Sequence, residues 1–139
     1  MISIRGGRNA VEIRIAAFGA VLLLIYILVA TQGKNSQYGA KWNVGARDEP
    51  LAEPRPLVGR LMRAQSNYLE TFPVAIVALL GVVLAGRTSA NTALGGWIWL
   101  GARVVYLPLY AAGVPVVRTI AWAASIVGLA MVSWPLLAG

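Results

Sequence analysis

Long apolar runs separated by short polar stretches dominate this sequence and predict membrane-spanning helices. A helix that rises ~1.5 Å per residue needs about 20 residues to cross ~30 Å of hydrocarbon. Four runs reach that length, at about residues 13–32, 56–86, 92–111 and 119–137. We therefore expect an all-α, integral membrane four-helix bundle in which residues 1–139 form a single membrane domain.

Prolines and charged residues mark the stretch at about residues 33–56 as a connecting loop. It contains Pro50, Pro54 and Pro56, and prolines at this density oppose helix formation. A solvated connector is therefore the preferred interpretation. Pro73 lies inside the second expected helix, where it predicts a local kink.

The distribution of Lys and Arg predicts the orientation in the membrane. Seven of these residues lie in the first loop, at the start of the second helix or in the third connection, whereas four lie on the other side, namely Arg5, Arg8, Arg14 and Arg87. Positively charged loops tend to stay in the cytoplasm. We therefore expect the first loop to be cytoplasmic and both termini to be outside. The first run is longer than a signal peptide and has no clear cleavage pattern, so we expect it to be retained.

Composition supports a membrane protein and excludes several kinds of chemistry. The chain is 58% hydrophobic and 12% charged, and its net charge of +7 suits anionic lipid and topology better than nucleic acid. There is no cysteine and no histidine, so a disulfide, a cysteine nucleophile and a histidine base are excluded. With only five carboxylates, most of them in the loop or near the ends, no protein-held metal is expected.

A polar stripe precedes the second apolar run, in the sequence RLMRAQSNYLETFP that begins at Arg60. Arg63, Asn67 and Glu70 fall at i, i+4 and i+7, so they share one helical face, with Arg60 one turn earlier. Gln65 points to a different face. Polar groups that simply join helices explain one amide well. They explain poorly the four arginines expected at this membrane face, Arg60 and Arg63 here with Arg103 and Arg118 further along the chain, so a functional site is indicated.

The third expected helix carries a second polar face. Arg103, Tyr106 and Tyr110 fall at i, i+3 and i+7. An interfacial aromatic belt with a snorkelling arginine would explain each residue singly, but the matched register favours a site. The predicted topology brings this face, Arg118 and the stripe of the second helix to the same depth at the cytoplasmic side.

These residues together suit a small molecule with several charges. The arginines can pair with carboxylates, Glu70 with an ammonium group and Asn67 with an amide, a combination that fits glutathione as a co-substrate. Glutathione would also supply the thiol that the chain lacks. A nearby guanidinium or phenol would favour the thiolate over the thiol. The residues of this candidate site are Arg60, Arg63, Asn67, Glu70, Arg103, Tyr106, Tyr110 and Arg118.

The same motifs resemble those of a known family. RLMRAQSNYLETFP is similar to the helix-two signature of the MAPEG family, the membrane-associated proteins of eicosanoid and glutathione metabolism, and ARVVYLPLY resembles helix three of that family. The resemblance implies a homotrimer in a bacterial inner membrane, with glutathione bound between subunits at the cytoplasmic side. It also implies conjugation or peroxide reduction of lipophilic substrates from the bilayer.

The resemblance also implies roles for individual residues. Arg63, Asn67, Glu70, Tyr106 and Tyr110 would contact glutathione, together with Arg103. Gln65 would reach the glutathione of the neighbouring subunit. Arg118 would stabilise the thiolate and is the expected catalytic residue. Thr71 stands where the family often has an aromatic residue.

Two other classes of function remain as alternatives. A small four-helix transporter would need an embedded carboxylate in the first helix, whereas Glu12 is expected at the membrane edge beside Arg14. A membrane assembly protein without catalytic activity would form complexes without glutathione. We prefer the glutathione-dependent enzyme, with conjugation and peroxide reduction both open.

Overall fold

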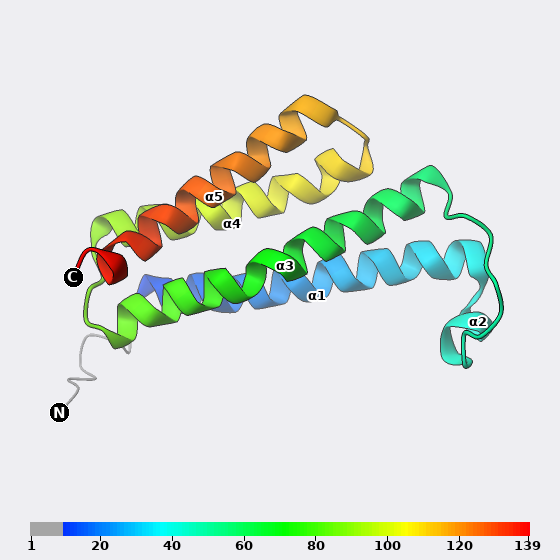
Figure 1. The fold of residues 1–139 in the computed structure, drawn as a ribbon, viewed down its shortest axis with the longest axis horizontal. Coiled ribbons are helices and arrows are strands. Elements are labelled where there is room, and N and C mark those ends of the chain that lie inside the picture. The colour runs from blue at the N-terminus through cyan, green and yellow to red at the C-terminus, as the bar shows by residue number, and fades with distance from the viewer. Residues whose placement is uncertain (1–9) are drawn as a thin grey trace.

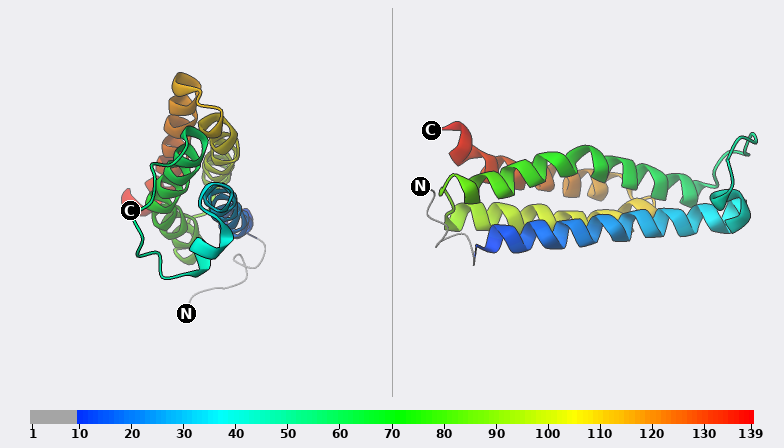
Figure 2. Two further views of the ribbon diagram at one scale, coloured as in Figure 1. Left: turned by 90° about the vertical axis from the view of Figure 1, so that its right-hand side faces the viewer. Right: turned by 90° about the horizontal axis from the view of Figure 1, so that it is seen from below.

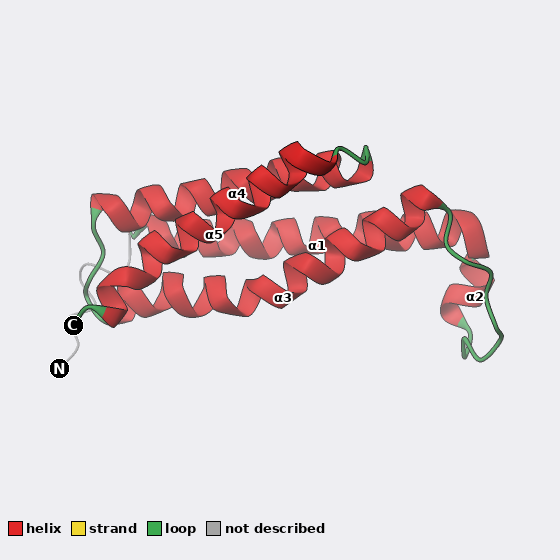
Figure 3. Cartoon of the chain, turned by 45° about the horizontal axis from the view of Figure 1, so that its top comes forward, coloured by secondary structure: helices red, strands yellow, loops and turns green. Residues whose placement is uncertain are grey.

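Residues 10–139 are described by a computed structural model, in which they form five helices and no strand (Figures 1 and 3). The helices are α1 (Val11–Tyr38), α2 (Ala40–Val44), α3 (Pro56–Leu84), α4 (Ala90–Ala111) and α5 (Pro115–Leu137). The chain is therefore all-α over these residues, as predicted. Arg5 and Arg8, which the orientation argument counted, lie outside the described part of the chain.

The four long helices form two antiparallel hairpins that pack side by side. α1 pairs with α3, and α4 pairs with α5 (Figure 1). The loop that carries α2 lies at one end of the molecule, and the C-terminal end of α5 lies at the other (Figures 1 and 2). The start of α3, the end of α4 and the start of α5 consequently lie toward the same end, which is the arrangement that the sequence predicted.

Several helix boundaries differ from the predictions. α1 continues to Tyr38 and α2 follows, so the prediction of a loop from residue 33 was wrong over this stretch. The prolines that oppose helix formation begin only at Pro50, which leaves the preceding residues free to be helical. α5 begins at Pro115 rather than at residue 119, because proline is well suited to the first position of a helix.

Pro73 does not interrupt α3. The helix runs through it as one continuous element and is visibly curved rather than broken (Figure 2, right). Proline at this position leaves the carbonyl of Leu69 without its usual helical donor, which explains curvature at this point. The local kink that the sequence predicted is observed as curvature of a continuous helix.

Three of the helices, α1, α3 and α5, are long and apolar enough to cross a membrane. α4 is 22 residues long but less apolar, because it contains Arg103 among glycines and aromatic residues. The apolar surface of the spanning helices is extensive, since large hydrophobic side chains along α1, α3 and α5 are exposed. This surface is suited to lipid or to other protein chains, as expected for an integral membrane protein.

An aromatic cluster joins the two hairpins at mid-height. The rings of Tyr26 and Tyr68 lie 4.6 Å apart between centroids, and that of Tyr68 lies 6.2 Å from Trp99. Both phenols are satisfied, since Tyr68 donates to the carbonyl of Gly19 at 2.5 Å and Tyr26 donates to the carbonyl of Arg103 at 2.6 Å. The Tyr26 bond fixes the backbone of α4 against α1 close to the polar face of α4, and the Tyr68 bond fixes α3 against α1.

Glu12 ties α1 to the other hairpin at the end opposite the α2 loop. Its carboxylate, only 3% exposed, accepts a hydrogen bond of 2.6 Å from the hydroxyl of Thr92 in the first turn of α4. Ser89 and Thr92 also form a reciprocal cap at the start of α4. Glu12 is therefore buried within the protein, in the first turn of α1.

Thr92→Val should lower the stability of the folded chain by about 1–2 kcal/mol, because it removes the hydroxyl that serves both the cap and Glu12. Thermal unfolding in detergent measures this effect. Thr88→Val, an exposed neighbour, is the matched control and should unfold at the wild-type temperature. Equal unfolding temperatures for both variants would show that the Glu12 contact contributes nothing.

Candidate functional site

A buried arginine lies at the centre of the polar face of α4. The side chain of Arg103 is 1% exposed, and it donates from Nη1 to Asn67 Oδ1 and from Nη2 to Thr71 Oγ1, both at 2.7 Å. Its Cζ lies 5.1 Å from the ring centroid of Tyr106 and 5.6 Å from that of Tyr68. The guanidinium is thus held by neutral groups and π-faces, and no carboxylate is among its hydrogen-bond partners.

The contact with Arg103 determines what Asn67 can offer to a ligand. A guanidinium has no acceptor, so the oxygen of the Asn67 amide must face Arg103. The amide nitrogen, with two N–H groups, is left for other partners. Since Asn67 lines a cavity, it presents donors rather than an acceptor to whatever occupies that cavity.

Tyr110 brings together two further arginines from different helices. Arg63 on α3 donates from Nε to the Tyr110 hydroxyl oxygen at 3.2 Å, and Cζ of Arg118 on α5 lies 4.5 Å from the centroid of the Tyr110 ring. The ring of Tyr106 lies 5.5 Å from that of Tyr110 in an edge-to-face arrangement. Because the Tyr110 oxygen accepts from Arg63, its own proton remains free to donate.

A cavity of about 200 Å³ opens among these groups, between α3, α4 and α5. It is lined by Asn67, Tyr106, Tyr110, Arg118, Thr119 and Trp122. None of these residues is a carboxylate, and the Thr119 hydroxyl already donates to the carbonyl of Pro115 at 2.9 Å. The lining therefore combines one guanidinium, several neutral donors and an indole, which suits an anionic occupant.

Arg118 belongs to the first turn of α5. The predicted start of this helix at residue 119 had placed Arg118 in the turn before it. Val114 precedes the helix and provides no side-chain cap, so no side chain satisfies the first N–H groups of α5. Uncapped N–H groups and the helix dipole make this end of a helix favourable for negative charge. The start of α5 and the Arg118 guanidinium therefore both favour negative charge nearby.

Arg60 has a different place from the one that the sequence predicted. Its Nε donates to the carbonyl of Ala111 at 2.9 Å, at the C-terminal end of α4. Its guanidinium also lies against Gly113, whose φ of 75° favours glycine. A cation at the C-terminus of a helix is electrostatically favourable. In one chain, Arg60 therefore joins α3 to the turn between α4 and α5, beside the cavity rather than in its lining.

Glu70 and Gln65 are not brought to the cavity in a single chain. Glu70 is exposed on α3, on the same side as the exposed Arg63 and Ser66, and Gln65 is partly exposed. Neither residue lines the cavity. Of the predicted site residues, one chain thus assembles Arg63, Asn67, Arg103, Tyr106, Tyr110 and Arg118, while Arg60, Gln65 and Glu70 lie around this group.

Three residues of the site were not singled out as site residues from the sequence. Thr71 accepts from Arg103, and Thr119 and Trp122 line the cavity. Trp122 follows Arg118 at i+4 and Thr71 follows Asn67 at i+4, so helical spacing from the predicted residues could have indicated both. Among residues 10–139, no three or more Asp, Glu, His or Cys side chains are grouped in a way that could hold a metal ion.

Comparisons with known proteins identify the family of the chain. No curated protein matches the sequence. The MAPEG family model matches residues 13–138, which is almost the whole chain and includes all of the residues that surround the cavity. The chain therefore belongs to the MAPEG family.

Proposed function

We propose that this protein is a glutathione-dependent membrane enzyme, either a transferase or a peroxidase, that acts on lipophilic electrophiles or hydroperoxides. Membership of the MAPEG family, which includes such enzymes, supports the proposal. The observation that carries it is the cavity beside Tyr110, whose polar groups are donors and whose guanidinium belongs to Arg118. Glutathione is an anionic peptide that needs such donors and brings its own thiol.

Each part of glutathione has a suitable group nearby. Arg63 and the free N–H groups of Asn67 suit carboxylate and carbonyl oxygens, and the Tyr110 hydroxyl can donate to a further acceptor. Arg103 adds positive charge next to Asn67, because its hydrogen-bond partners Asn67 and Thr71 are neutral and leave its charge unbalanced. Arg118 is our candidate for the group beside the sulfur, because its guanidinium is not used in a hydrogen bond within the described residues.

Arg118 would act by stabilising negative charge. A guanidinium beside the sulfur lowers the pKa of the glutathione thiol, and each pKa unit corresponds to ~1.4 kcal/mol. In conjugation, the thiolate forms a C–S bond and the leaving group departs with the electron pair. In peroxide reduction, the thiolate attacks one peroxide oxygen, and an alcohol and a sulfenate result. A second glutathione then converts the sulfenate to a disulfide and water.

The position of Glu70 supports a site that is completed by other copies of the chain. Glu70 lies halfway along α3, and its carboxylate is exposed on the surface of the single chain. An exposed carboxylate at this depth of a bilayer is costly unless another protein chain or a polar ligand covers it. We therefore propose a homotrimer in which neighbouring copies cover this face, Glu70 receives the ammonium group of glutathione, and Gln65 reaches the site of the next copy.

We also propose an orientation of the chain in the membrane. The end that holds the α2 loop also holds the starts of α3 and α5, which carry Arg60, Arg63 and Arg118 (Figure 1). Arg14 near the start of α1 and Arg87 between α3 and α4 lie toward the other end. The positive-inside rule favours a cytoplasmic site with both termini outside. Glutathione would then enter from the cytoplasm of a bacterial cell, and the lipophilic substrate from the inner membrane.

Thiolate formation tests the proposal directly. Glutathione is titrated into the purified, detergent-solubilised protein near neutral pH, and thiolate is followed by ultraviolet absorbance. We expect a saturable signal in the wild type that is lost in Arg118→Ala. Arg14→Ala is the matched control, since Arg14 is an exposed arginine toward the opposite end of the molecule, and it should behave as the wild type.

The two ways in which this test can fail have different meanings. Binding of glutathione without thiolate in the wild type would contradict the catalytic role of Arg118 and favour a glutathione-binding assembly protein. Absence of binding in the wild type would overturn the proposed function itself. A loss of signal in Arg14→Ala equal to that in Arg118→Ala would indicate a general effect of charge.

A further inference from the structure

The loop between α1 and α3 is closed at its base by hydrogen bonds. The side chain of Gln37 donates to the carbonyl of Glu53 at 2.9 Å and accepts from the backbone N–H of Arg55 at 2.7 Å. The hydroxyl of Tyr38 donates to the carbonyl of Ala52 at 2.8 Å. The two ends of the loop are thus held together, and its tip is positioned relative to α1.

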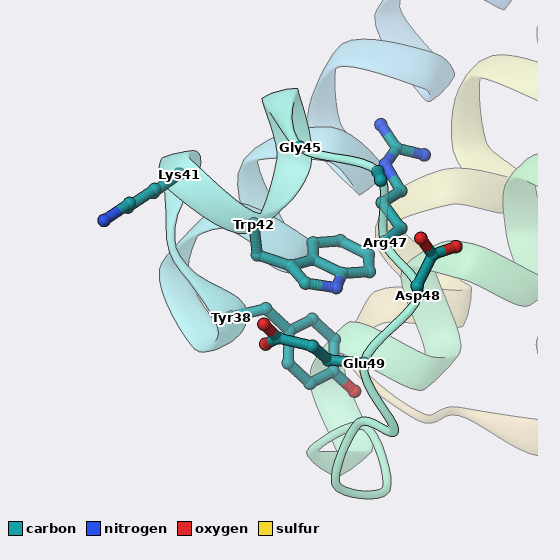
Figure 4. A pocket seen from close by; sticks show the side chains of 8 residues that line it. Tyr38, Lys41, Trp42, Gly45, Arg47, Asp48 and Glu49 are labelled. Atoms are coloured by element: carbon teal, nitrogen blue, oxygen red, sulfur yellow. The ribbon is translucent and has the colours of Figure 1, made fainter.

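Trp42 is the centre of this tip, between Tyr38 and Arg47 (Figure 4). Its ring centroid lies 5.2 Å from that of Tyr38 and 5.2 Å from Cζ of Arg47. Arg47 donates from Nε and Nη2 to the carbonyl of Asn43 at 3.1 and 2.8 Å, and from Nη2 to Asn43 Oδ1 at 2.6 Å. Three hydrogen bonds therefore hold the guanidinium against the indole.

The backbone of Arg47 is in a conformation that such residues rarely adopt. Its φ is 62°, and among residues 10–139 it is the only residue besides glycines with a positive φ. A residue in this region typically costs about 1–3 kcal/mol and persists only when its surroundings hold it. The bonds to Asn43 supply that restraint, and strain of this kind is concentrated at binding sites.

The indole N–H of Trp42 has no partner. Nε1 is shielded from solvent and makes no hydrogen bond within the described residues. An unsatisfied shielded donor costs about 1–3 kcal/mol, so a small side-chain movement that exposes Nε1 to an acceptor brought by a ligand would be favourable. The closed loop base, the strained Arg47 and this free donor are independent observations that converge on one place.

A cavity of about 550 Å³ lies beside Trp42, and its lining carries both signs of charge. Lys41, Arg47, Asp48 and Glu49 all belong to the lining, and Figure 4 shows the Lys41 ammonium directed away from Trp42, whereas Arg47 lies beside it. All the hydrogen bonds of Arg47 go to Asn43, so its Nη1 remains available. With equal numbers of cations and anions, the lining suits a zwitterion better than a simple anion.

The cavity lies at the level expected for lipid headgroups. α1 has 28 residues, about 42 Å at ~1.5 Å per residue, which exceeds ~30 Å of hydrocarbon. Its last turns, from Gln32 to Tyr38, are polar and would emerge into the interfacial layer. Tyr and Trp are typical of that layer, so Tyr38 and Trp42 fit it well.

We propose that this cavity binds a zwitterionic group with one phosphate and one ammonium, as in the headgroup of phosphatidylethanolamine. A phosphate oxygen accepts from Trp42 Nε1 and from Arg47, and the ammonium group pairs with Asp48 and Glu49. The site is separate from the glutathione cavity and shares no lining residue with it. The inference therefore does not rest on the proposed enzyme activity.

Native mass spectrometry of the full chain in detergent tests this site, with phosphatidylethanolamine and phosphatidylglycerol added at equal concentration. We expect phosphatidylethanolamine to bind more tightly. Trp42→Phe keeps the aromatic ring but removes the indole donor, and it should weaken binding about tenfold. Trp134→Phe, an exposed tryptophan in the last turns of α5, is the matched control and should bind as the wild type.

The carboxylates and the source of the headgroup have separate tests. The double variant Asp48→Asn with Glu49→Gln should remove the preference for phosphatidylethanolamine over phosphatidylglycerol. Competition by free phosphoethanolamine would show that the headgroup alone is recognised, and its absence with retained lipid preference would assign the site to intact lipid. Equal binding of the two lipids to the wild type, or unchanged binding in folded Trp42→Phe, would overturn the proposal.

Discussion

Gly128→Ala is expected to separate α4 from α5 and to destabilise the chain by about 3 kcal/mol or more. A Cβ atom at residue 128 would lie 2.5 Å from the carbonyl oxygen of Gly95 and 2.7 Å from the backbone nitrogen of Trp99. These atoms belong to the backbone of α4, so no side-chain rotation can relieve the overlap. Because the cavity lies between the same hairpin and α3, its geometry should be lost as well. Thermal unfolding in detergent measures the first effect, and glutathione titration measures the second.

Gly101→Ala is the matched control on α4. A Cβ at residue 101 would meet no atom within 4 Å in the single chain, and alanine is favoured over glycine in a helix by roughly 0.5–1 kcal/mol. This variant should therefore be as stable as the wild type or slightly more so. If Gly128→Ala unfolded at the same temperature as Gly101→Ala, the close approach of α4 and α5 would be contradicted.

The sequence predicted the long helices well, because apolar runs of this length have few alternatives to a membrane helix. It also predicted the register of α4, in which Arg103, Tyr106 and Tyr110 follow one another along one side with ring and guanidinium centres about 5 Å apart. Helical periodicity is a local property, and a face can therefore be predicted without knowledge of the packing. The prediction that the polar faces of α3 and α4 lie at the same depth followed from the order of the membrane-spanning helices alone.

Contacts between the hairpins could not be predicted in the same way. Arg60 was grouped with the site by its spacing, yet its guanidinium joins the carbonyl end of α4, a position fixed by how the two hairpins cross. The bond between Glu12 and Thr92 joins residues 80 positions apart. Such pairs depend on tertiary packing, which a helical face does not specify. Glu70 illustrates the same point, since its carboxylate is exposed on α3 and does not line the cavity of the single chain.

The short-range errors have local causes that the sequence does contain. Pro115 at the first position of α5 was a start signal that would have placed Arg118 inside the helix. Ser89 and Thr92 form a reciprocal cap, which marks the start of α4 two residues before the predicted boundary. The pattern of apolar residues alone located the helices, and the capping residues would have refined their ends.

Arg103→Met is expected to weaken glutathione binding at least tenfold while the unfolding temperature stays unchanged or rises. Arg103 is a buried cation held by two neutral acceptors, and burial of a charge without a counter-charge is costly, so removal of the charge offsets the loss of the two hydrogen bonds. The bond from Tyr26 goes to the backbone carbonyl of Arg103, so it survives the substitution. A cation that contributes little to stability is explained if it serves an anionic ligand, and this prediction rests on the proposed function.

Two variants make the experiment decisive. Thr71→Val removes one of the two acceptors that orient the guanidinium, so it should weaken binding less than Arg103→Met does. Arg14→Met carries the same change of charge toward the opposite end of the molecule and should leave binding unchanged. A fall in unfolding temperature with unchanged affinity would make Arg103 a structural anchor of α4 on α3. Loss of affinity at full stability would instead mean that the fold keeps this charge for its ligand, because nothing in the packing of the chain requires it.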